Sequence, residues 1–422
     1  FLMMASKIEG VYIPSFYDVT YNEDKTVKET IPNRDGIPAN PRKRIIKNMD
    51  EVPYPEALIV PYIETVHERV VLELFRGCTR GCRFCQAGMI YRPIREKSIE
   101  TLKTSLDKLI KSTGYDEISL SSLSTSDYSK LSELTDVLIE EYASKNIGIS
   151  LPSLRLDNFT MEIAEKIQQV RKSGLTFAPE AGTQRMRDVI NKGVSEQDLK
   201  DATTKAFEMG WHSVKLYFMI GLPTERYEDL DGIRNLAYDV IDTYRQVHGG
   251  KLSRKFSVTV STSTFVPKPF TPFQWHPQDT QDVVRDKQQY LVKALKNRDI
   301  RYNYHDSKTS LMEAVISRGD RRIGKVIYDA FKAGAKFDGW SEYFNLDIWV
   351  EAMEKNNLDI SWYAHRERSY DEILPWDFID IGVNRKYLER ENEKAKVAMD
   401  AFAYRVAKYV GAYAAAMNGV DV

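Results

Sequence analysis

Short apolar runs alternate with segments of helical periodicity through the middle of the chain. The first run, RVVLELF at 69–75, precedes a segment in which Ser98 can cap a helix and apolar residues recur at every third or fourth position. Further runs rich in β-branched and aromatic residues lie at 117–123, 147–154, 175–180, 213–223 and 255–267. Six alternations of strand and helix predict an α/β fold with a parallel sheet covered by helices.

The flanks of this region have different patterns. Residues 1–68 are polar and rich in turn residues, which predicts an extended lead-in that is a remnant of, or a linker from, an upstream domain. Residues 278–395 are helix-rich and aromatic, and we expect a C-terminal cap or substrate domain there. Residues 396–422 are alanine-rich and predict an amphipathic tail helix.

The composition is that of an ordinary globular protein, with 42% apolar and 29% charged residues. The 60 basic and 61 acidic side chains almost cancel, so global charge gives no support for binding to nucleic acid or to an anionic membrane. No apolar run reaches the roughly 20 residues that a membrane span needs. Cysteine is rare and clustered rather than spread as a disulfide framework, and this predicts a reducing cytoplasm.

All three cysteines of the chain, Cys78, Cys82 and Cys85, lie within eight positions in the stretch ELFRGCTRGCRFCQAG (73–88). Three thiolates on a tight loop can hold three irons of a [4Fe–4S] cluster and leave the fourth iron open to a cofactor or substrate. Three neighbouring arginines would offset the negative charge of a thiolate-bound cluster: Arg76, Arg80 and Arg83.

The three cysteines have two simpler interpretations. A structural zinc site needs four ligands, and since there is no fourth cysteine, a distant histidine would have to complete it. Buried and inert cysteines are the other interpretation. Confinement of all three to one loop rich in glycine and arginine favours the iron–sulfur cluster over both.

The spacing of Cys78, Cys82, Phe84 and Cys85 resembles the signature of radical S-adenosylmethionine (SAM) enzymes. The longer string VHERVVLELFRGCTRGCRFCQAGMIYRPIRE is similar to an uncharacterised group of that superfamily that often carries an N-terminal cobalamin-binding-type domain. Relatives of this group include tRNA methylthiotransferases and the Elongator catalytic subunit. The resemblance implies a partial (β/α)6 TIM-like barrel, here at 69–277.

The resemblance also implies the cofactors and the chemistry. The three cysteines would hold a [4Fe–4S] cluster whose open iron is chelated by the amino and carboxylate groups of SAM. One electron, delivered by a donor such as flavodoxin or ferredoxin, would cleave SAM to methionine and a 5′-deoxyadenosyl radical that abstracts hydrogen from a substrate.

In such barrels the chemistry lies at the carboxyl ends of the strands, so the residues after each predicted strand are candidates for SAM binding. The hydroxylic stretch after the second strand stands where the family binds the SAM amino group. Arg155 suits the SAM carboxylate, Glu180 the ribose hydroxyls, and MIGLPTE (219–225) resembles the stretch near adenine. The predicted cofactor-binding residues are Phe84, Ser121, Ser122, Ser124, Arg155, Glu180, Phe265 and Val266. Ordinary loop polarity and helix capping would also explain the polar ones.

The cysteine count limits the radical reaction. Sulfur insertion needs a second cluster, and methylation through a cysteine-bound methyl carrier needs a further thiol, yet the first cluster uses all three cysteines. Hydrogen abstraction leading to rearrangement or elimination remains, as does cobalamin-assisted methylation by the full-length protein, which the usual architecture of the group favours. The alternative is an iron–sulfur electron-transfer or scaffold protein that assembles a cluster without cleaving SAM.

Other segments have two interpretations each. The basic run SRGDRRIG (317–324) could grip a phosphate or carboxylate, or could be a solvated helix face. NPRKRIIKN (40–48) is predicted to be a linker rather than a nucleic-acid surface. Trp275, in an ordered proline-rich segment, could lie at the rim of the site or in the core.

Overall fold

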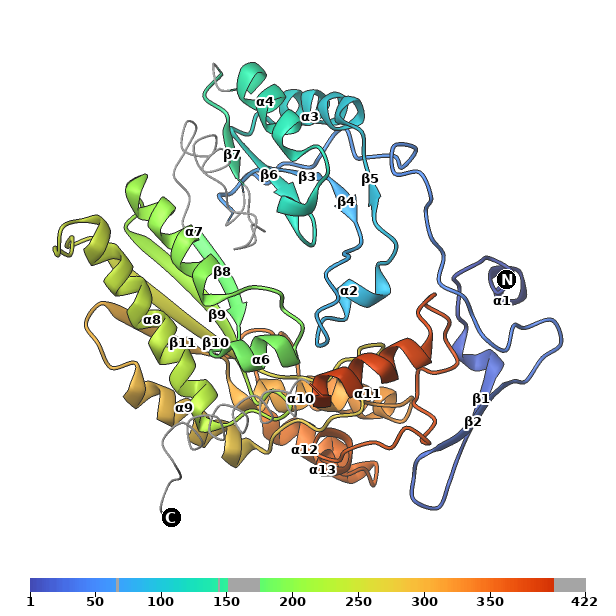
Figure 1. Ribbon diagram of the computed structural model, residues 1–422. Coiled ribbons are helices and arrows are strands. Elements are labelled where there is room, and N and C mark those ends of the chain that lie inside the picture. Colours follow the sequence, from blue (N-terminus) through green and yellow to red (C-terminus); the bar gives the residue numbers. More distant parts are fainter. Residues whose placement is uncertain (66–67, 143–144, 151–174, 398–422) are drawn as a thin grey trace, which may run out of the picture.

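The computed structural model describes residues 1–65, 68–142, 145–150 and 175–397 (Figure 1). Two sheets of parallel strands are its framework. The first has the order β3 (Val70–Glu73), β6 (Glu117–Ser121) and β7 (Gly148–Ser150). The second contains β8 (Leu175–Glu180), β9 (Ser213–Ile220), β10 (Ser257–Thr264) and β11 (Ile300–Tyr304), again in chain order.

Helices cover the outer faces of both sheets. The first sheet carries α3 (Ile99–Thr113) and α4 (Leu131–Tyr142), and the second carries α7 (Glu196–Glu208), α8 (Tyr227–Val247) and α9 (Gln281–Ala294) (Figure 1). The predicted α/β fold with parallel strands and covering helices is therefore confirmed.

Local sequence signals set the ends of these helices. Ser98 caps α3 by accepting a hydrogen bond from the backbone N–H of Thr101, and Gly114 ends the helix in the left-handed conformation. Ser195 begins α7 in a reciprocal capping box with Asp198. These caps satisfy backbone groups that the first and last turns of a helix leave without partners.

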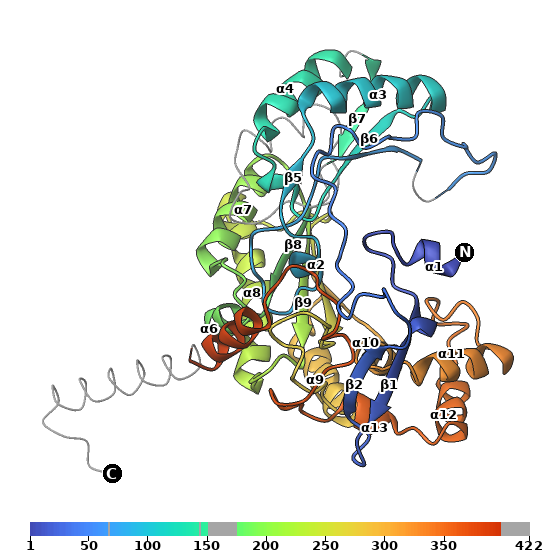
Figure 2. The ribbon, with the colours of Figure 1, turned by 90° about the vertical axis from the view of Figure 1, so that its right-hand side faces the viewer.

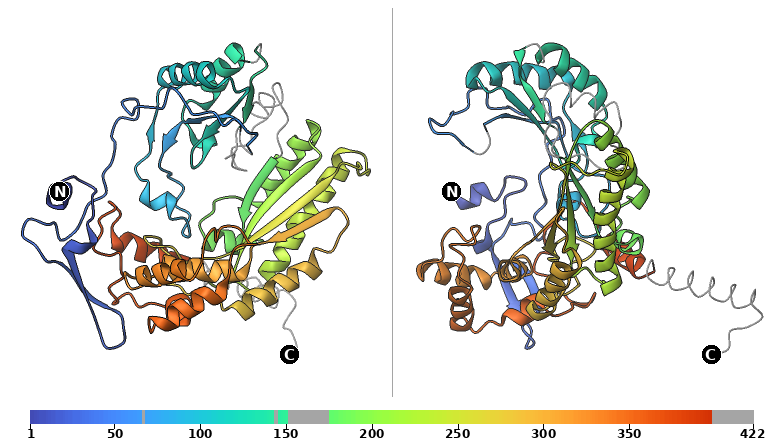
Figure 3. Two further views of the ribbon diagram at one scale, coloured as in Figure 1. Left: turned by 180° about the vertical axis from the view of Figure 1, so that it is seen from behind. Right: turned by 90° about the vertical axis from the view of Figure 1, so that its left-hand side faces the viewer.

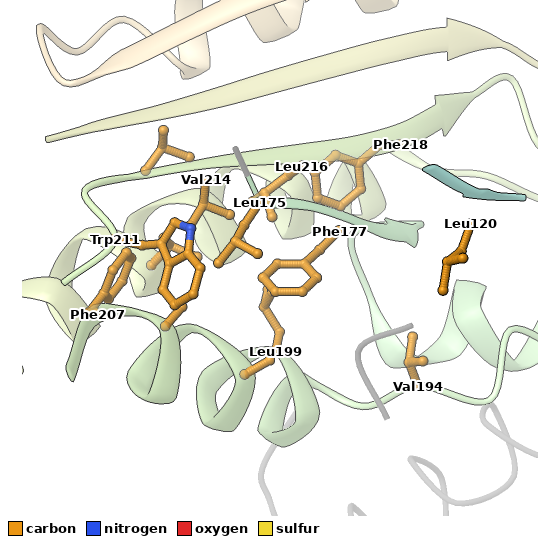
Figure 4. Close-up of a cluster of buried hydrophobic side chains, with 14 of the residues drawn as sticks. Leu120, Leu175, Phe177, Val194, Leu199, Phe207, Trp211, Val214, Leu216 and Phe218 are labelled. Carbon is orange, nitrogen blue, oxygen red and sulfur yellow. The ribbon is translucent and has the colours of Figure 1, made fainter. Parts of the chain in front are cut away.

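One apolar core joins the two sheets. Leu120 of β6 belongs to the same buried cluster as Phe177 of β8 and Leu216 of β9, together with side chains from α7 and the turn that follows it (Figure 4). Strand β8 buries alternate residues, as the period of two in a strand predicts, whereas β9 alternates as far as Tyr217 and then buries three residues in a row. The shared core makes the two sheets parts of one folded unit.

Strand β11 was not predicted. It pairs in parallel with β10, from Ile300 opposite Val258 to Tyr304 opposite Thr262. Only Ile300 among its five residues is buried, so the segment has no apolar run to mark it as a strand. The sheet thus continues past residue 277, into the region for which only helices were expected.

Residues 1–65 and the C-terminal region lie side by side. The lead-in contains α1 (Leu2–Ala5), η1 (Pro14–Phe16) and an antiparallel hairpin of β1 (Tyr17–Tyr21) and β2 (Val27–Pro32). The hairpin packs beside the C-terminal helices (Figure 2). These are α10 (Ser307–Ser317), α11 (Ile323–Lys332), α12 (Leu346–Lys355) and α13 (Ile360–Ala364).

The arginines of 317–324 make this contact. Arg321 donates hydrogen bonds to the carbonyl oxygens of Tyr17 and Pro14, at 2.6 and 2.9 Å, and Arg322 donates to that of Lys25 at 2.8 Å. Arg318 is fully buried and donates to the carbonyl oxygens of Ala364 and Arg366. The run is therefore neither an open anion-binding site nor a solvated helix face, because its guanidinium groups donate hydrogen bonds to the backbone of other segments.

Seen from behind, the two sheets, the C-terminal helices and the lead-in follow one another around α2 (Ala87–Ile90) (Figure 3). Trp275 packs under this helix, in a buried cluster with Met89 and Trp376, so its core interpretation holds. No helix in the described ranges is long and apolar enough to cross a membrane.

Two helical glycines provide a test of the packing between α8 and the segment after β8. A Cβ on Gly232 would lie 2.6 Å from the carbonyl carbon of Gly182, whereas a Cβ on Gly324 in α11 would meet nothing within 4 Å. Gly232→Ala should lower the free energy of unfolding by about 1–3 kcal/mol through overpacking. Gly324→Ala should raise it by about 0.5–1 kcal/mol, because alanine favours a helix. Urea denaturation of both variants measures this, and equal effects would contradict the close approach.

Candidate functional site

The cysteine loop begins and ends at a short antiparallel pair of strands. Strand β4 (Phe75–Arg76) leads into it beyond the carboxyl end of β3, and β5 (Arg95–Glu96) pairs with β4 after α2. Gly77 begins the loop with a φ of 100°, and a Cβ there would lie 2.6 Å from the carbonyl oxygen of Pro93. Glycine is therefore required where the chain enters the loop.

The three cysteines are partly exposed and reduced. The backbone N–H of Cys85 donates to the carbonyl oxygen of Cys82 at 3.1 Å, and the N–H of Gly88 donates to the Cys85 sulfur at 3.4 Å. Burial raises the pKa of the Cys85 thiol, with a smaller contribution in the same direction from Cys78, while the Gly88 N–H lowers it. An amide aimed at this sulfur favours the thiolate form that binds iron.

The donor set fits an iron–sulfur cluster. In a [4Fe–4S] cluster each thiolate binds its own iron, so the three sulfurs need not meet at one point. A zinc site needs that convergence. Among the described residues, no three His, Cys, Asp or Glu side chains are grouped closely enough to hold a single metal ion.

Arg80 joins the cysteine loop to the segment after β6. Its guanidinium forms a two-pronged ion pair with Asp127, with Nε 2.8 Å from Oδ2. The same Oδ2 accepts a hydrogen bond from the Ser124 hydroxyl at 2.7 Å. Ser124, which was predicted to contact SAM, is thus buried and hydrogen-bonded to Asp127. Ser121 and Ser122 instead line a cavity beside the loop.

Arg83 anchors the loop from the other side. Its buried guanidinium donates to the carbonyl oxygens of Asp188 and Val189, both at 2.8 Å, at the end of α6 (Gln184–Val189). It also pairs with Glu391, which lies in the helix at 385–397, at 3.3 Å. Burial lowers the pKa of Arg83, and the Glu391 carboxylate opposes that effect.

Arg76 also has a carboxylate partner. It holds Glu73 through two hydrogen bonds of 2.7 and 3.0 Å, and these bonds raise the pKa of Arg76. The arginines expected to offset cluster charge are therefore each paired with a carboxylate of the protein. Their direct effect is to fix the shape of the loop.

The predicted apolar contacts separate into two groups. Phe84 packs against a buried cluster that contains Phe265, Met219 and Leu222. These residues come from the carboxyl ends of β9 and β10, so Phe84 and Phe265 belong to one apolar cluster. Val266 instead packs among side chains of α10, α11 and α12.

Glu180 lies at the carboxyl end of β8 with a left-handed φ of 69°. Its carboxylate is 3.2 Å from the ammonium group of Lys192. Both groups act on the Cys85 thiol, whose pKa Glu180 raises and Lys192 lowers, so all three lie near one another. Arg155 lies outside the described residues.

The stretch MIGLPTE closes the end of β9. Glu225 accepts a hydrogen bond from the backbone N–H of Gly221 at 2.7 Å and pairs with Lys287 of α9 at 2.8 Å. Burial raises the pKa of Glu225, and the Lys287 ammonium opposes it. The Glu225 carboxylate therefore stabilises the turn after β9.

Several residues that hold the site were not predicted. Asn191 donates to the carbonyl oxygen of Gly81 at 3.0 Å, and the hydroxyl of Tyr387 lies 3.4 Å from Arg92. With Asp127, Lys192 and Glu391, they reach the loop from distant parts of the chain. Of these five, only Asp127 lies in the hydroxylic stretch after a predicted strand, and no local pattern distinguishes the others.

The sequence profile of the radical SAM superfamily matches residues 72–237, which include the cysteine loop. These residues match the radical SAM domain, a domain of enzymes that use a [4Fe–4S] cluster and SAM, and the match supports the predicted superfamily, enzyme class and pair of cofactors.

The chain is also similar to several curated proteins. The chain is 32% identical over 257 residues to an uncharacterised protein of Methanocaldococcus jannaschii, covering 61% of this chain and 53% of that protein. It is 26% identical over 212 residues to an uncharacterised methyltransferase of Pyrococcus horikoshii, covering 49% and 45%. It is 27% identical over 195 residues to a protein of Methanocaldococcus jannaschii named as a methylthiotransferase, covering 43% and 42%. The chain thus spans about half the length of these relatives.

A short segment resembles a different enzyme. Over 45 residues, 11% of each chain, it is 70% identical to the acetate kinase of Heliobacterium modesticaldum. A match of that length does not bear on the activity of the radical SAM domain.

Solved structures show more distant likeness. The cobalamin-dependent SAM radical enzyme OxsB is 12% identical, with a TM-score of 0.41 over 93% of this chain and 60% of that chain. The radical SAM methyltransferase TsrM from Kitasatospora setae is 11% identical, with a TM-score of 0.39 over 49% and 38%. Structural similarity at this level supports no conclusion about the residues of the site.

Two arginines of the cysteine loop should differ in their effect on stability. Arg83→Met leaves buried carbonyl oxygens without a donor and breaks a buried ion pair, and should lower the free energy of unfolding by about 3 kcal/mol. Arg76→Met removes a pair that is about one-third exposed, and should cost about 1 kcal/mol or less. Urea denaturation of the metal-free variants compares them, and equal losses would contradict the anchoring role of Arg83.

His276 should make stability depend on pH. Its Nε2 is 2.8 Å from Oδ1 of Asn392, in the helix that carries Glu391, and burial lowers the pKa of His276 below its usual 6.5. Below pH 6.5 the unfolded chain takes up a proton that the folded imidazole resists, so the free energy of unfolding should fall by up to about 1.4 kcal/mol per pH unit. Urea denaturation from pH 7.5 to 5.5 should show a shallower slope in His276→Gln. His248→Gln controls for the loss of an imidazole, and an unchanged slope in His276→Gln would contradict the assignment.

Proposed function

We propose that this protein is a radical SAM enzyme in which Cys78, Cys82 and Cys85 hold a [4Fe–4S] cluster whose open iron binds SAM. When bound, this pair of cofactors supplies a 5′-deoxyadenosyl radical that abstracts hydrogen from a substrate. The observation that carries the proposal is the position of three cysteine thiols on one loop, beyond the carboxyl end of β3 and within the matched domain.

The roles of other residues follow from their contacts. Phe84 and Phe265 would form an apolar wall, since they share one buried cluster. Ser121 and Ser122 would offer hydroxyl groups to SAM from the end of β6. Glu180 would accept hydrogen bonds from ribose hydroxyls, with Lys192 holding its carboxylate in place. We retain Arg155 as a candidate for the SAM carboxylate, from its sequence position alone.

We propose cobalamin-assisted methylation as the reaction of the full-length protein. The name of the Pyrococcus horikoshii relative supports methyl transfer, and the cluster would use all three cysteines of this chain. The electron would come from a partner such as flavodoxin or ferredoxin in the cytoplasm. Methylation predicts S-adenosylhomocysteine as a product when cobalamin is present, and deoxyadenosine without a methylated product would contradict it.

The radical assignment is tested by anaerobic reconstitution with iron and sulfide, reduction with dithionite and addition of SAM. We expect 5′-deoxyadenosine from the wild type and a loss of at least about 100-fold in Cys82→Ala, because the cluster loses one of its three ligands. Thr79→Ala, an exposed position of the same loop, is the matched control and should retain activity. A four-iron cluster that never cleaves SAM would favour the electron-transfer or scaffold protein.

A further inference from the structure

A cavity of about 910 Å³ lies beside the cysteine loop. Gly77 and Gln86 of the loop segment line it, as do Ser121 and Ser122 at the end of β6 and residues 41–44 of the lead-in. Its volume is in the range of sites that bind small molecules. The lead-in therefore supplies part of a pocket that also contains residues of the radical SAM domain.

The charge of the lining is strongly positive. Five cations, against a single carboxylate, face this cavity: Arg42, Lys43, Arg44, Arg76 and Arg95, against Glu73. Arg76 binds Glu73, so that pair cancels. Asp380, outside the lining, lies 3.9 Å from Arg42 and offsets one of the other four cations. A net excess of three positive charges remains.

Two of these cations are held by backbone rather than by carboxylates. Lys43 donates to the carbonyl oxygens of Ile90 and Arg92, at 2.7 and 2.9 Å. Arg95 donates to those of Ile46, Tyr91 and Pro93. Burial lowers the pKa of both groups. Arg95 lowers that of Lys43 further and Asp380 opposes this, while Arg76 lowers that of Arg95 further and Glu73 opposes it. Their positions are fixed without neutralising their charge.

Arg44 is exposed in the lead-in, and its backbone is held against Gly10. A Cβ on Gly10 would lie 2.9 Å from Cβ of Arg44. Another part of the cavity wall is apolar or aromatic, with Phe75, Ile90, Tyr91 and Phe270 among its residues. The lining thus combines a cationic part with an aromatic part.

We infer that this cavity binds the substrate, and that the substrate carries a phosphate group on an aromatic or apolar body. This inference rests on the proposed radical SAM function, since it assigns the substrate class of the same site. A phosphate ester carries about −1.5 to −2 charges at neutral pH, which matches the positive excess better than the single charge of a carboxylate. Arginine side chains can bind its oxygens in pairs. The aromatic wall would hold the body beside the cysteine loop.

The experiment uses the reconstituted full chain and phenyl phosphate as the probe, followed by ³¹P NMR titration. Arg42→Gln/Arg44→Gln should weaken binding at least about tenfold, because two charged donors are lost. Arg254→Gln/Lys255→Gln, an exposed pair elsewhere, is the matched control and should change the affinity less than about twofold. Deoxyadenosine formation without substrate should be unchanged in the Arg254→Gln/Lys255→Gln control.

Equal affinity in the two double variants would overturn the inference. Displacement of phenyl phosphate by SAM would also overturn it, since the cations would then serve the SAM carboxylate. Benzoate binding as tightly as phenyl phosphate would overturn the phosphate assignment. If the probe binds as expected but no SAM is cleaved, the anion site stands and the proposed function fails, so the two failures are distinguishable.

Discussion

The shape of the site depends on the contacts that the buried guanidinium of Arg83 makes. A loop that presents three thiols for iron cannot be held by a large apolar core of its own, because its chemistry requires polar and partly exposed groups. Arg83 holds the loop in place instead, because its guanidinium donates hydrogen bonds to carbonyl oxygens at the end of α6 and forms an ion pair with Glu391. Taking a charged group out of water is unfavourable, so the arrangement is stable only with every partner in place.

Other parts of the chain are fixed through this loop. Arg80 and Asp127 join it to the end of β6, and Asn191 joins it to the turn after α6. The helix at 385–397 contacts it through Glu391 and Tyr387. The lead-in reaches the return of the loop through Lys43. Residues far apart in sequence thus determine the conformation of eight consecutive positions.

The sequence predicts the elements whose signals are local. The caps at Ser98 and Ser195 and the apolar runs of six strands are such signals, and the cysteine spacing points to the site. What depends on packing between distant segments could not be predicted. Strand β11 has too few buried residues to form a pattern, and the partners of Arg318 and Arg83 lie dozens to hundreds of positions away. The basic run at 40–48 was expected to be a linker because nothing in its sequence shows that it lines a cavity.

Electron paramagnetic resonance of the reconstituted, dithionite-reduced protein, recorded with and without SAM, tests the central claim most directly. A radical SAM protein should show the signal of one reduced [4Fe–4S] cluster per chain, and that signal should change when SAM binds the open iron. A cluster signal that SAM leaves unchanged would contradict SAM binding at the open iron. A protein that assembles no cluster would contradict the cluster assignment of the three cysteines.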